Sequence, residues 1–424
     1  MLAHYKLIGC GWGARVWRPP SSWLICCTNA FPRSFSREVW GIKEKSVCFS
    51  GSCSMNCLRS VRHYTMSSIS APVSCSPFTK AVVSSMRKLQ KNSVLLTIDL
   101  TTAVADEAIR RRDSVVVAYH PIIFRGLKAI TLDDTQQRSL LRLAQHGISV
   151  YSPHTAVDTV PGGMADWLCD VVTGSFKSTS ATPQRPIPES ASKLYSEPTY
   201  PHPETAATTT TTSTSTSTST PTTPHTRSTI HPSPLSSIPA GLETAGAGRL
   251  VTFSEPQPLP TLIDHIAQGV GLPGGIPIAI PQSASSINDL RIRTVSMCPG
   301  SGAGVLLRAP GPLPDLLFTG EMSHHEALAA TERGSVVISL AHSNSERGYL
   351  RAVMRARLAE DVEDCWRRDR EDALGALRDS AKQGGAAIAS ASASGELDVY
   401  SDGEVEVAVS KADRDPYGIM VWRG

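Results

Sequence analysis

The sequence predicts an α/β protein made of two α/β halves with mixed sheets, and two observations carry this prediction. Short apolar runs rich in β-branched residues alternate with segments of helical apolar spacing, first over residues 93–154 and again over 248–350. A Thr/Ser/Pro-rich tract separates the two stretches. Because strands that alternate with helices are typical of a parallel sheet covered by its crossover helices, we expect one sheet in each half.

The first half is predicted to contain three buried strands and three helices. Thr101 is expected to cap the second helix, because its side-chain oxygen can accept a hydrogen bond from a free amide of the first turn. The strands are expected at 93–100, 114–120 and 147–154, and the helices at 79–90, 101–112 and 136–146.

The second half repeats the alternation and ends in a long charged helix. Its strands are expected at 248–256, 291–298, 316–320 and 335–342, and its helices at 260–270, at 321–333 and from Asn344 onward. The stretch 350–380 is predicted as one helix because Leu350, Val353, Met354 and Leu358 fall at helical spacing. A final strand is expected at 404–410.

Residues 175–247 are predicted to be a disordered insertion, because a tract of Thr, Ser and Pro cannot bury enough apolar surface to offset its chain entropy. Its histidines, His202, His225 and His231, are expected to be solvated and not metal ligands. The predicted organisation is a leader or gene-model extension at 1–65, a first half at 66–174, the insertion at 175–247, a second half at 248–350, and a helix, flexible break and strand at 351–424.

The first 65 residues are rich in Arg and Ser and poor in acids, which is the composition of a mitochondrial transit peptide. An over-extended gene model explains them equally well, since Met66 opens a plausible mature protein. The expected location is therefore the cytoplasm if Met66 is the start, and the mitochondrion if residues 1–65 act as a transit peptide.

Composition excludes several classes of function. The formal net charge is only +3, and no stretch combines dense Lys and Arg with aromatic residues, so direct DNA binding is not expected. No apolar run reaches the roughly 18 residues that a membrane helix needs. Seven of the ten cysteines precede residue 76 and do not have paired zinc-ligand spacing, so the folded body is predicted to carry free thiols inside the cell.

His, Asp or Glu follows directly after four of the predicted strands. Loops at the carboxyl ends of parallel strands converge on one crevice, and imidazole with carboxylate suits zinc, manganese or iron. A single His after a strand usually fills a structural role, but four such motifs together favour a shared metal site in the cleft between the halves. The motifs are VVVAYHPIIF with His120, VYSPHTAVD with His154 and Asp158, TGEMSHHEAL with Glu321, His324 and His325, and VISLAHSNSE with His342 and Glu346.

The glycine-rich segment PGSGAG at 299–304 follows another predicted strand. It lacks the lysine of a phosphate-binding P-loop and the spacing of a dinucleotide-binding motif. A tight turn is the simpler interpretation. A phosphate- or substrate-binding loop stays open, since backbone amides in such loops bind anions.

The motifs SPFTKAV, LLTIDLTTAVADEAI, YHPIIFRGLKAIT, CPGSGAG, TGEMSHHEALAA, AHSNSERGYL and SKADRDPYG together resemble the NIF-three-like family, whose members are also described as GTP cyclohydrolase I type 2 homologues. The likeness spans about 76–174, 248–352 and 404–420, and is to fungal and other eukaryotic members. It implies a toroidal homo-oligomer of two-domain α/β subunits with a two-metal site. The implied metal ligands are His120, Asp158, His342 and Glu346.

Two departures from the family pattern bear on these expectations. Tyr119 stands where the bacterial His-His-Pro pattern has its first His, so one metal ligand is lost. A Trp-Asp-Asn-x-Gly segment is missing between Gln90 and Ser93. The first strand of the sheet is therefore expected to be absent, which would leave an exposed edge prone to aggregation.

The resemblance implies a metal-dependent hydrolase that acts on a nucleotide or another phosphate-bearing small molecule. One or two divalent ions (zinc, manganese or iron) would be its cofactors, Glu346 would bridge metals or orient water, and His154 or His325 would move protons. His324 and Glu321 are expected near the ligands. The alternative is a protein-interaction factor, with a transcription-factor partner and a structural or vestigial metal.

Overall fold

The computed structural model describes residues 91–177, 208–209, 223–234, 238–271, 275–382, 400 and 402–420, and the structural statements that follow refer to these residues. The predicted leader, the predicted helix at 79–90, His202 and most of the Thr/Ser/Pro tract lie outside them. The predicted break between the last helix and the last strand also falls almost wholly outside them.

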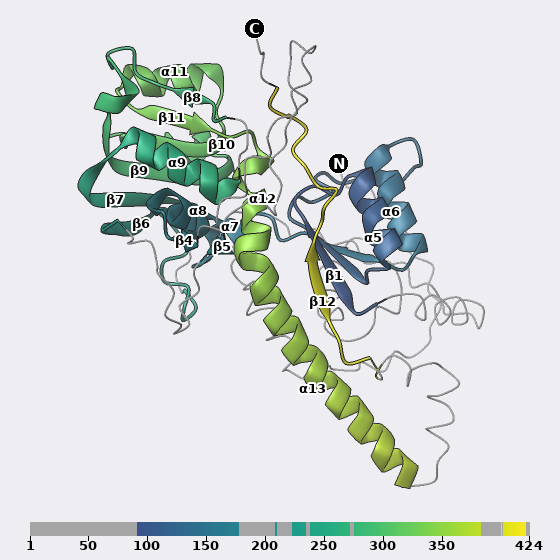
Figure 1. Ribbon diagram of the computed structural model, residues 1–424. Helices are drawn as coiled ribbons and strands as arrows, with labels where there is room; N and C mark the ends of the chain where they lie inside the picture. Colours follow the sequence, from purple (N-terminus) through teal and green to yellow (C-terminus); the bar gives the residue numbers. More distant parts are fainter. Residues whose placement is uncertain are drawn as a thin grey trace, which may run out of the picture.

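The first sheet has four parallel strands in the order β12-β1-β2-β3. Thr101 accepts a hydrogen bond from the amide of Val104 and so begins the helix that follows the first strand, as predicted. The strands are β12 (Glu406–Val409), β1 (Ser93–Thr97), β2 (Val115–Ala118) and β3 (Ser149–Tyr151), and the helices beside them are α5 (Thr102–Arg111) and α6 (Thr135–Gln145) (Figure 1).

The second sheet has six strands in the order β6-β7-β9-β10-β11-β8. Its centre is parallel, and the pairs β6–β7, β7–β9 and β11–β8 are antiparallel, so the sheet is mixed. The strands are β6 (His225–Pro232), β7 (Gly246–Pro258), β8 (Ile278–Ala279), β9 (Arg291–Ser301), β10 (Leu316–Glu321) and β11 (Val336–Ser339). The two sheets confirm the predicted α/β class.

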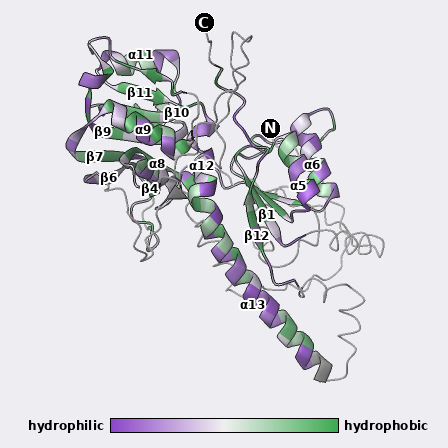
Figure 2. Cartoon of the chain, in the orientation of Figure 1, coloured by the Kyte–Doolittle hydropathy of each residue, from purple (hydrophilic) through white to green (hydrophobic). Residues whose placement is uncertain are grey.

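Helices cover both faces of the second sheet (Figure 1). Phe318 packs into the large core with the helices α8 (Met164–Thr173) and α9 (Leu259–Val270), whereas its neighbour Leu317 packs with α10 (Ala303–Leu306) and α11 (His324–Glu332). This alternation follows from the period of two along a strand. Most of the strand residues are apolar in Figure 2, as expected for a sheet covered on both sides.

Short elements connect the rest of the chain. A turn of π-helix at Leu350–Met354 leads into the long helix α13 (Arg355–Lys382), which projects from the body in Figure 1 and carries alternating polar and apolar residues in Figure 2. No helix among the described residues has the length and apolar character to span a bilayer. The other elements are α7 (Thr155–Thr159), β4 (Phe176–Lys177), β5 (Thr208–Thr209), η2 (Ile287–Asp289), η3 (Ser343–Ser345) and α12 (Arg347–Tyr349).

Three segments have positions or pairings that the sequence did not predict. Strand β6 falls inside the predicted disordered insertion, because the antiparallel pairing with β7 satisfies its backbone despite a weak sequence pattern. Within it His225 and His231 bond to backbone carbonyls, so they are not simply solvated. Helix α8 belongs to the predicted first half but packs against α9 and the second sheet. The last strand, β12, pairs with β1 and not with its neighbours in sequence.

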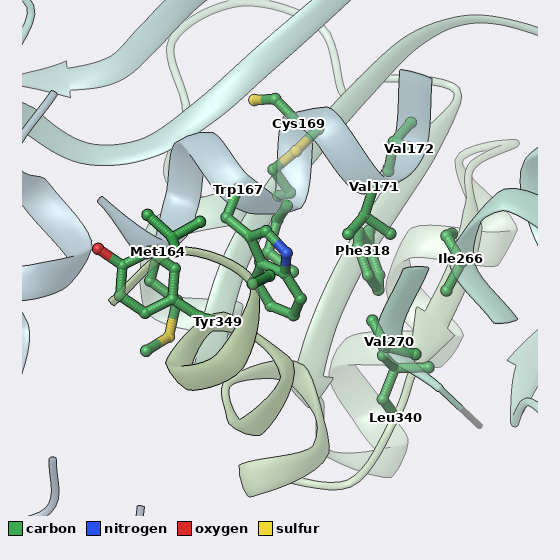
Figure 3. Packing of buried hydrophobic residues seen from close by; sticks show 14 of the residues in the cluster. Met164, Trp167, Cys169, Val171, Val172, Ile266, Val270, Phe318, Leu340 and Tyr349 are labelled. Carbon is green, nitrogen blue, oxygen red and sulfur yellow. The ribbon is translucent and has the colours of Figure 1, made fainter. Parts of the chain in front are cut away.

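One large core joins the two sheets. It contains Val94 and Leu96 of β1 together with residues of β9, β10 and β11. Trp167 of α8 lies near its centre, 2% exposed, and its ring lies 6.2 Å from that of Tyr349, which ends α12 (Figure 3). The relative position of the sheets is therefore set by shared packing and not by a flexible linker.

A buried polar network reinforces the same junction. Arg347, 2% exposed, donates to both carboxylate oxygens of Asp413 at 3.2 Å and to the Ser343 hydroxyl at 2.8 Å. Asp413 also accepts a hydrogen bond from the amide of Ile98, at the end of β1. Asp415 accepts two hydrogen bonds from Ser343. The C-terminal segment thus ties the first sheet to the segment that follows β11.

We expect Asp413→Ala to lower the free energy of unfolding by about 3–5 kcal/mol, because it leaves the buried Arg347 charge without its partner. Urea unfolding of the full chain measures the loss. The control is Arg367→Ala, which removes an exposed ion pair with Asp364 and should cost under about 1 kcal/mol. Equal losses in the two variants would show that the Arg347 pair has no special role.

Candidate metal centre

Two strand ends, one from each sheet, face each other at the junction. His120 lies two residues beyond β2, and its amide donates to the carbonyl of Ile98. His342 lies three residues beyond β11, after a sharp turn in which Ala341 has a φ of +69°. Glu346 follows one helical turn later, at the end of η3. The predicted motifs therefore do bring a histidine from each half together with an acid.

His120, His342 and Glu346 form a group that could hold a metal ion. One ligand atom of each lies within 4.8 Å of the others, and the described residues contain no second group of three such side chains. The Nε2 atoms of His120 and His342 each lie 3.5 Å from a different Glu346 carboxylate oxygen. The two imidazole rings are 5.1 Å apart. Both rings thus direct the same nitrogen toward one carboxylate.

The other nitrogen of each ring is held by a second carboxylate. His120 Nδ1 donates to Asp99 at 2.9 Å, and His342 Nδ1 donates to Glu321 at 3.0 Å. Metal-binding histidines usually have such a carboxylate partner, which fixes the tautomer and the orientation of the ring. Glu321 therefore lies beside the ligands, as the sequence predicted.

The carboxylates make this a place that favours positive charge. Burial works against the charged form of His120, but Asp99 and Glu346 outweigh it and raise its pKa to about 10. Burial would raise the pKa of Asp99, but the hydrogen bond and charge of His120 lower it on balance. Burial raises the pKa of Glu346, against the opposing effect of His120.

The residues present fit a cation. Glu346 is 1% exposed, and its Oε2 atom has no hydrogen-bond partner. Because a buried carboxylate oxygen without a partner is costly, a cation between Glu346 and the two Nε2 atoms would satisfy it. Two imidazoles with one carboxylate are also a donor set that zinc and iron use.

Gly300 provides the space for this group. A Cβ at this position would lie 2.6 Å from Glu346 Oε1 and 3.0 Å from His342 Nε2, and the backbone φ is +61°. The amide of Gly300 donates to the Ser345 hydroxyl, and the amide of Gly302 donates to Thr319. These two amides therefore donate to side chains of the protein itself. Residues 299–301 of the PGSGAG segment end β9 and residues 303–304 begin α10, so Gly302 alone joins the strand to the helix. The amides of Gly300 and Gly302 do not support the phosphate-loop alternative.

Asp158 and His154 lie close by but outside the three-residue group. Tyr119 donates its hydroxyl to both carboxylate oxygens of Asp158 at 2.9 Å. Burial and the nearby Glu346 charge raise the pKa of Asp158 to about 8. The His154 ring lies 5.8 Å from that of His120. Burial and the neighbouring imidazoles of His120 and His342 lower its pKa to about 4, which keeps it neutral.

His324 and His325 occupy the first turn of α11, which Ser323 and Glu326 begin with a reciprocal capping box. Both rings are exposed and lie 5.1 Å from each other. Neither belongs to the group formed by His120, His342 and Glu346. A role for His325 therefore rests on its exposed position near Glu321, and not on contact with the ligands.

The sequence patterns did not indicate that Asp99 and Arg347 lie at this site. Asp99 follows β1 as His120 follows β2, so its place after a strand was a usable signal. Arg347 lies next to Glu346 and reaches within 3.7 Å of Asp99. Its role depends on Asp413, which lies 66 residues further along the chain, and no local pattern indicates that contact.

We expect Gly300→Ala to lower the free energy of unfolding by about 1–3 kcal/mol, because it combines a strained backbone with a clash against Glu346. It should also displace the candidate ligands and weaken binding of Mn²⁺. Thermal unfolding and metal titration measure the two effects. Gly304→Ala is the matched control, since no atom lies within 4 Å of its Cβ position. The proposed fit would be wrong if both variants bound Mn²⁺ equally well.

Comparison with known proteins agrees with this architecture. The family model described as Duf34/NIF3 (NGG1p interacting factor 3) matches residues 83–369. The protein NIF3 homolog of Schizosaccharomyces pombe is 39% identical over 269 residues, which cover 63% of this chain and 76% of that protein. The NGG1-interacting factor 3 of Saccharomyces cerevisiae is 32% identical over 273 residues, 64% of this chain and 76% of that one.

Among solved structures, the Bacillus cereus protein related to NIF3 has a similar fold. Its TM-score is 0.50 at 16% identity, and the match covers 93% of this chain and 97% of that chain. The match of the family model spans more than half of the chain, and it includes both strand-end histidines and Glu346. The chain therefore belongs to the Duf34/NIF3 family, as its motifs predicted.

Proposed function

We propose that this chain is a hydrolase that depends on a divalent metal ion, with His120, His342 and Glu346 as the protein ligands. The observation that carries the proposal is the buried Glu346 Oε2 atom, which lacks a hydrogen-bond partner and faces imidazoles whose other nitrogens are held by carboxylates. Sites with three protein ligands keep one position for water or substrate, and such sites are usually catalytic.

The exposure of the ligands supports a site that is open on one side. Glu346 is buried at the base, whereas the side chains of His120 and His342 are 23% and 36% exposed. A substrate can therefore approach from the imidazole side. A bound ion of this kind lowers the pKa of a water molecule to about 7 and polarises the bond to be broken.

Nearby side chains are proposed to handle protons. His154 is the proposed acceptor of the proton that hydrolysis takes from water, because its ring lies 5.8 Å from that of His120. Glu346 lies at the buried bottom of the site, where its carboxylate is shielded from solvent. His325 is proposed to contact the substrate or leaving group, because its ring is exposed at the start of α11.

The proposed substrate is a nucleotide or another phosphate-bearing small molecule. The loop after β2 carries the exposed cations Arg125 and Lys128 on either side of Leu127. Phe124, which is 67% exposed, has its ring 6.4 Å from that of His154. An exposed aromatic ring next to cations suits a planar, anionic molecule.

We expect the double variant His342→Ala, Glu346→Ala to lose bound metal and hydrolytic activity together, because it removes two of the three ligands. Elemental analysis of the purified chain measures the metal, and a panel of phosphate esters and purine nucleotides measures activity. The matched control is His146→Ala, Glu404→Ala, which removes the same side-chain types at exposed positions. A wild-type chain that holds no metal and cannot be reloaded would refute the proposal.

Asp99→Ala should reduce metal affinity about 10- to 100-fold, because His120 loses the carboxylate that orients its ring. Titration of the metal-free chain with Mn²⁺ measures the change. Asp106→Ala is the control, since Asp106 is 48% exposed and pairs only with the surface residue Arg142 in the described structure. Unchanged affinity in the Asp99 variant would show that His120 is oriented without it.

A second candidate function is protein interaction, which one structural feature favours. Phe124 and Leu132, in the segment between β2 and α6, are 67% and 63% exposed, and exposed apolar residues often mark binding surfaces. The yeast relative carries the name NGG1-interacting factor 3. Metal removal separates the two functions: a catalytic ion takes activity with it, whereas a structural ion chiefly takes stability.

A further inference from the structure

Tyr119 and Asp158 form a second polar pair beside the three ligands. Tyr119 is 3% exposed and directly precedes His120, while Asp158 lies in the short helix α7. The Tyr119 hydroxyl lies 2.9 Å from Asp158 Oδ1 and 2.9 Å from Oδ2. The pair therefore occupies the space next to the candidate metal centre.

The symmetry of this contact determines what Asp158 can bind. A hydroxyl at equal distances from both oxygens lies on the side of the carboxylate where a chelated cation would be held. The ring of Tyr119 is buried at the end of a strand whose residues are 5% exposed or less, so it cannot easily swing away. In the described structure the Asp158 carboxylate therefore accepts its side-chain hydrogen bonds from Tyr119.

The imidazoles of the two candidate ligands, His120 and His342, offer no spare nitrogen. Both Nε2 atoms of His120 and His342 face Glu346, and both Nδ1 atoms are held by Asp99 and Glu321. Neither Asp158 nor His154 joins a group of three ligand atoms within 4.8 Å among the described residues. One ion can thus be held with three protein ligands, whereas the described residues offer no second group of three ligand atoms for another ion.

We infer that the centre binds a single divalent ion. The Tyr119 hydroxyl, through its hydrogen bonds to Asp158, occupies the position at which a second ion would bind. This inference rests on the metal site of the proposed function. It departs from the two-ion site that the family resemblance implies, and it assigns Asp158 to positioning instead of ligation. The departure follows from one residue, Tyr119, and its contact.

The test is the number of ions that the full chain binds. The wild-type chain is stripped with a chelator, loaded with Mn²⁺ and passed through a desalting column, and metal per chain is measured by elemental analysis. Electron paramagnetic resonance then shows whether the ions are isolated or magnetically coupled. We expect one isolated ion per chain. Asp158→Asn, which still accepts a hydrogen bond from Tyr119, should also bind one ion, with an affinity within about twofold of wild type.

Tyr119→His provides the converse measurement. It removes the hydroxyl from Asp158 and adds an imidazole nitrogen, so we expect a second Mn²⁺ and a coupled signal. Thermal unfolding confirms that each variant is folded. Two ions in the wild-type chain, or the loss of an ion in Asp158→Asn, would overturn the inference while leaving the proposed metal site intact. No bound ion in the wild-type chain would overturn the proposed function itself.

Discussion

The candidate metal centre depends on how the two sheets are positioned relative to each other, because its candidate ligands come from both of them. His120 follows β2 of the first sheet, whereas His342 and Glu346 follow β11 of the second. The buried guanidinium of Arg347 fixes this relative position. It lies next to Glu346 in sequence and binds Asp413, which itself accepts the amide at the end of β1. The same short segment therefore supplies a metal ligand and joins the sheets.

This arrangement brings several buried or half-buried acids together. Because a buried carboxylate without a partner costs free energy, most of these acids are held by specific partners. Three of these carboxylates have partners: Asp99 binds His120 and lies 3.7 Å from Arg347, Glu321 binds His342, and Asp158 binds Tyr119. Glu346 is the exception, with an oxygen that has no hydrogen-bond partner. Unpaired buried charge is unfavourable unless a cation compensates it, so Glu346 is the carboxylate in this network that a bound cation would stabilise.

The sequence predicted most of the local structure, and three of its four expected metal ligands lie together in the structure, because both depend on short-range patterns. Apolar runs located β1, β2, β10 and β11, and a histidine after two of these strands located the centre. Pairings across long separations were not predictable: β12 joins β1 from more than 300 residues away. The family resemblance implied a ligand role for Asp158, but its contact in the structure is with the hydroxyl of Tyr119, 39 residues earlier. Residue type shows what a side chain can bind, and only the fold shows which partner reaches it.

The position of the predicted insertion explains how the fold tolerates it. Within the predicted insertion the structure describes β5, which pairs with β4, and β6. Strand β6 is the edge strand of the second sheet, separated from β11 by β7, β9 and β10. An edge strand needs hydrogen bonds on one side only, so its connection can vary without disturbing the parallel strands at the centre. Loop length also costs little, because closure entropy rises only with the logarithm of length. The strands that end at the metal centre, β2 and β11, are instead joined to their neighbours by direct pairing, which keeps the ligand positions independent of the insertion.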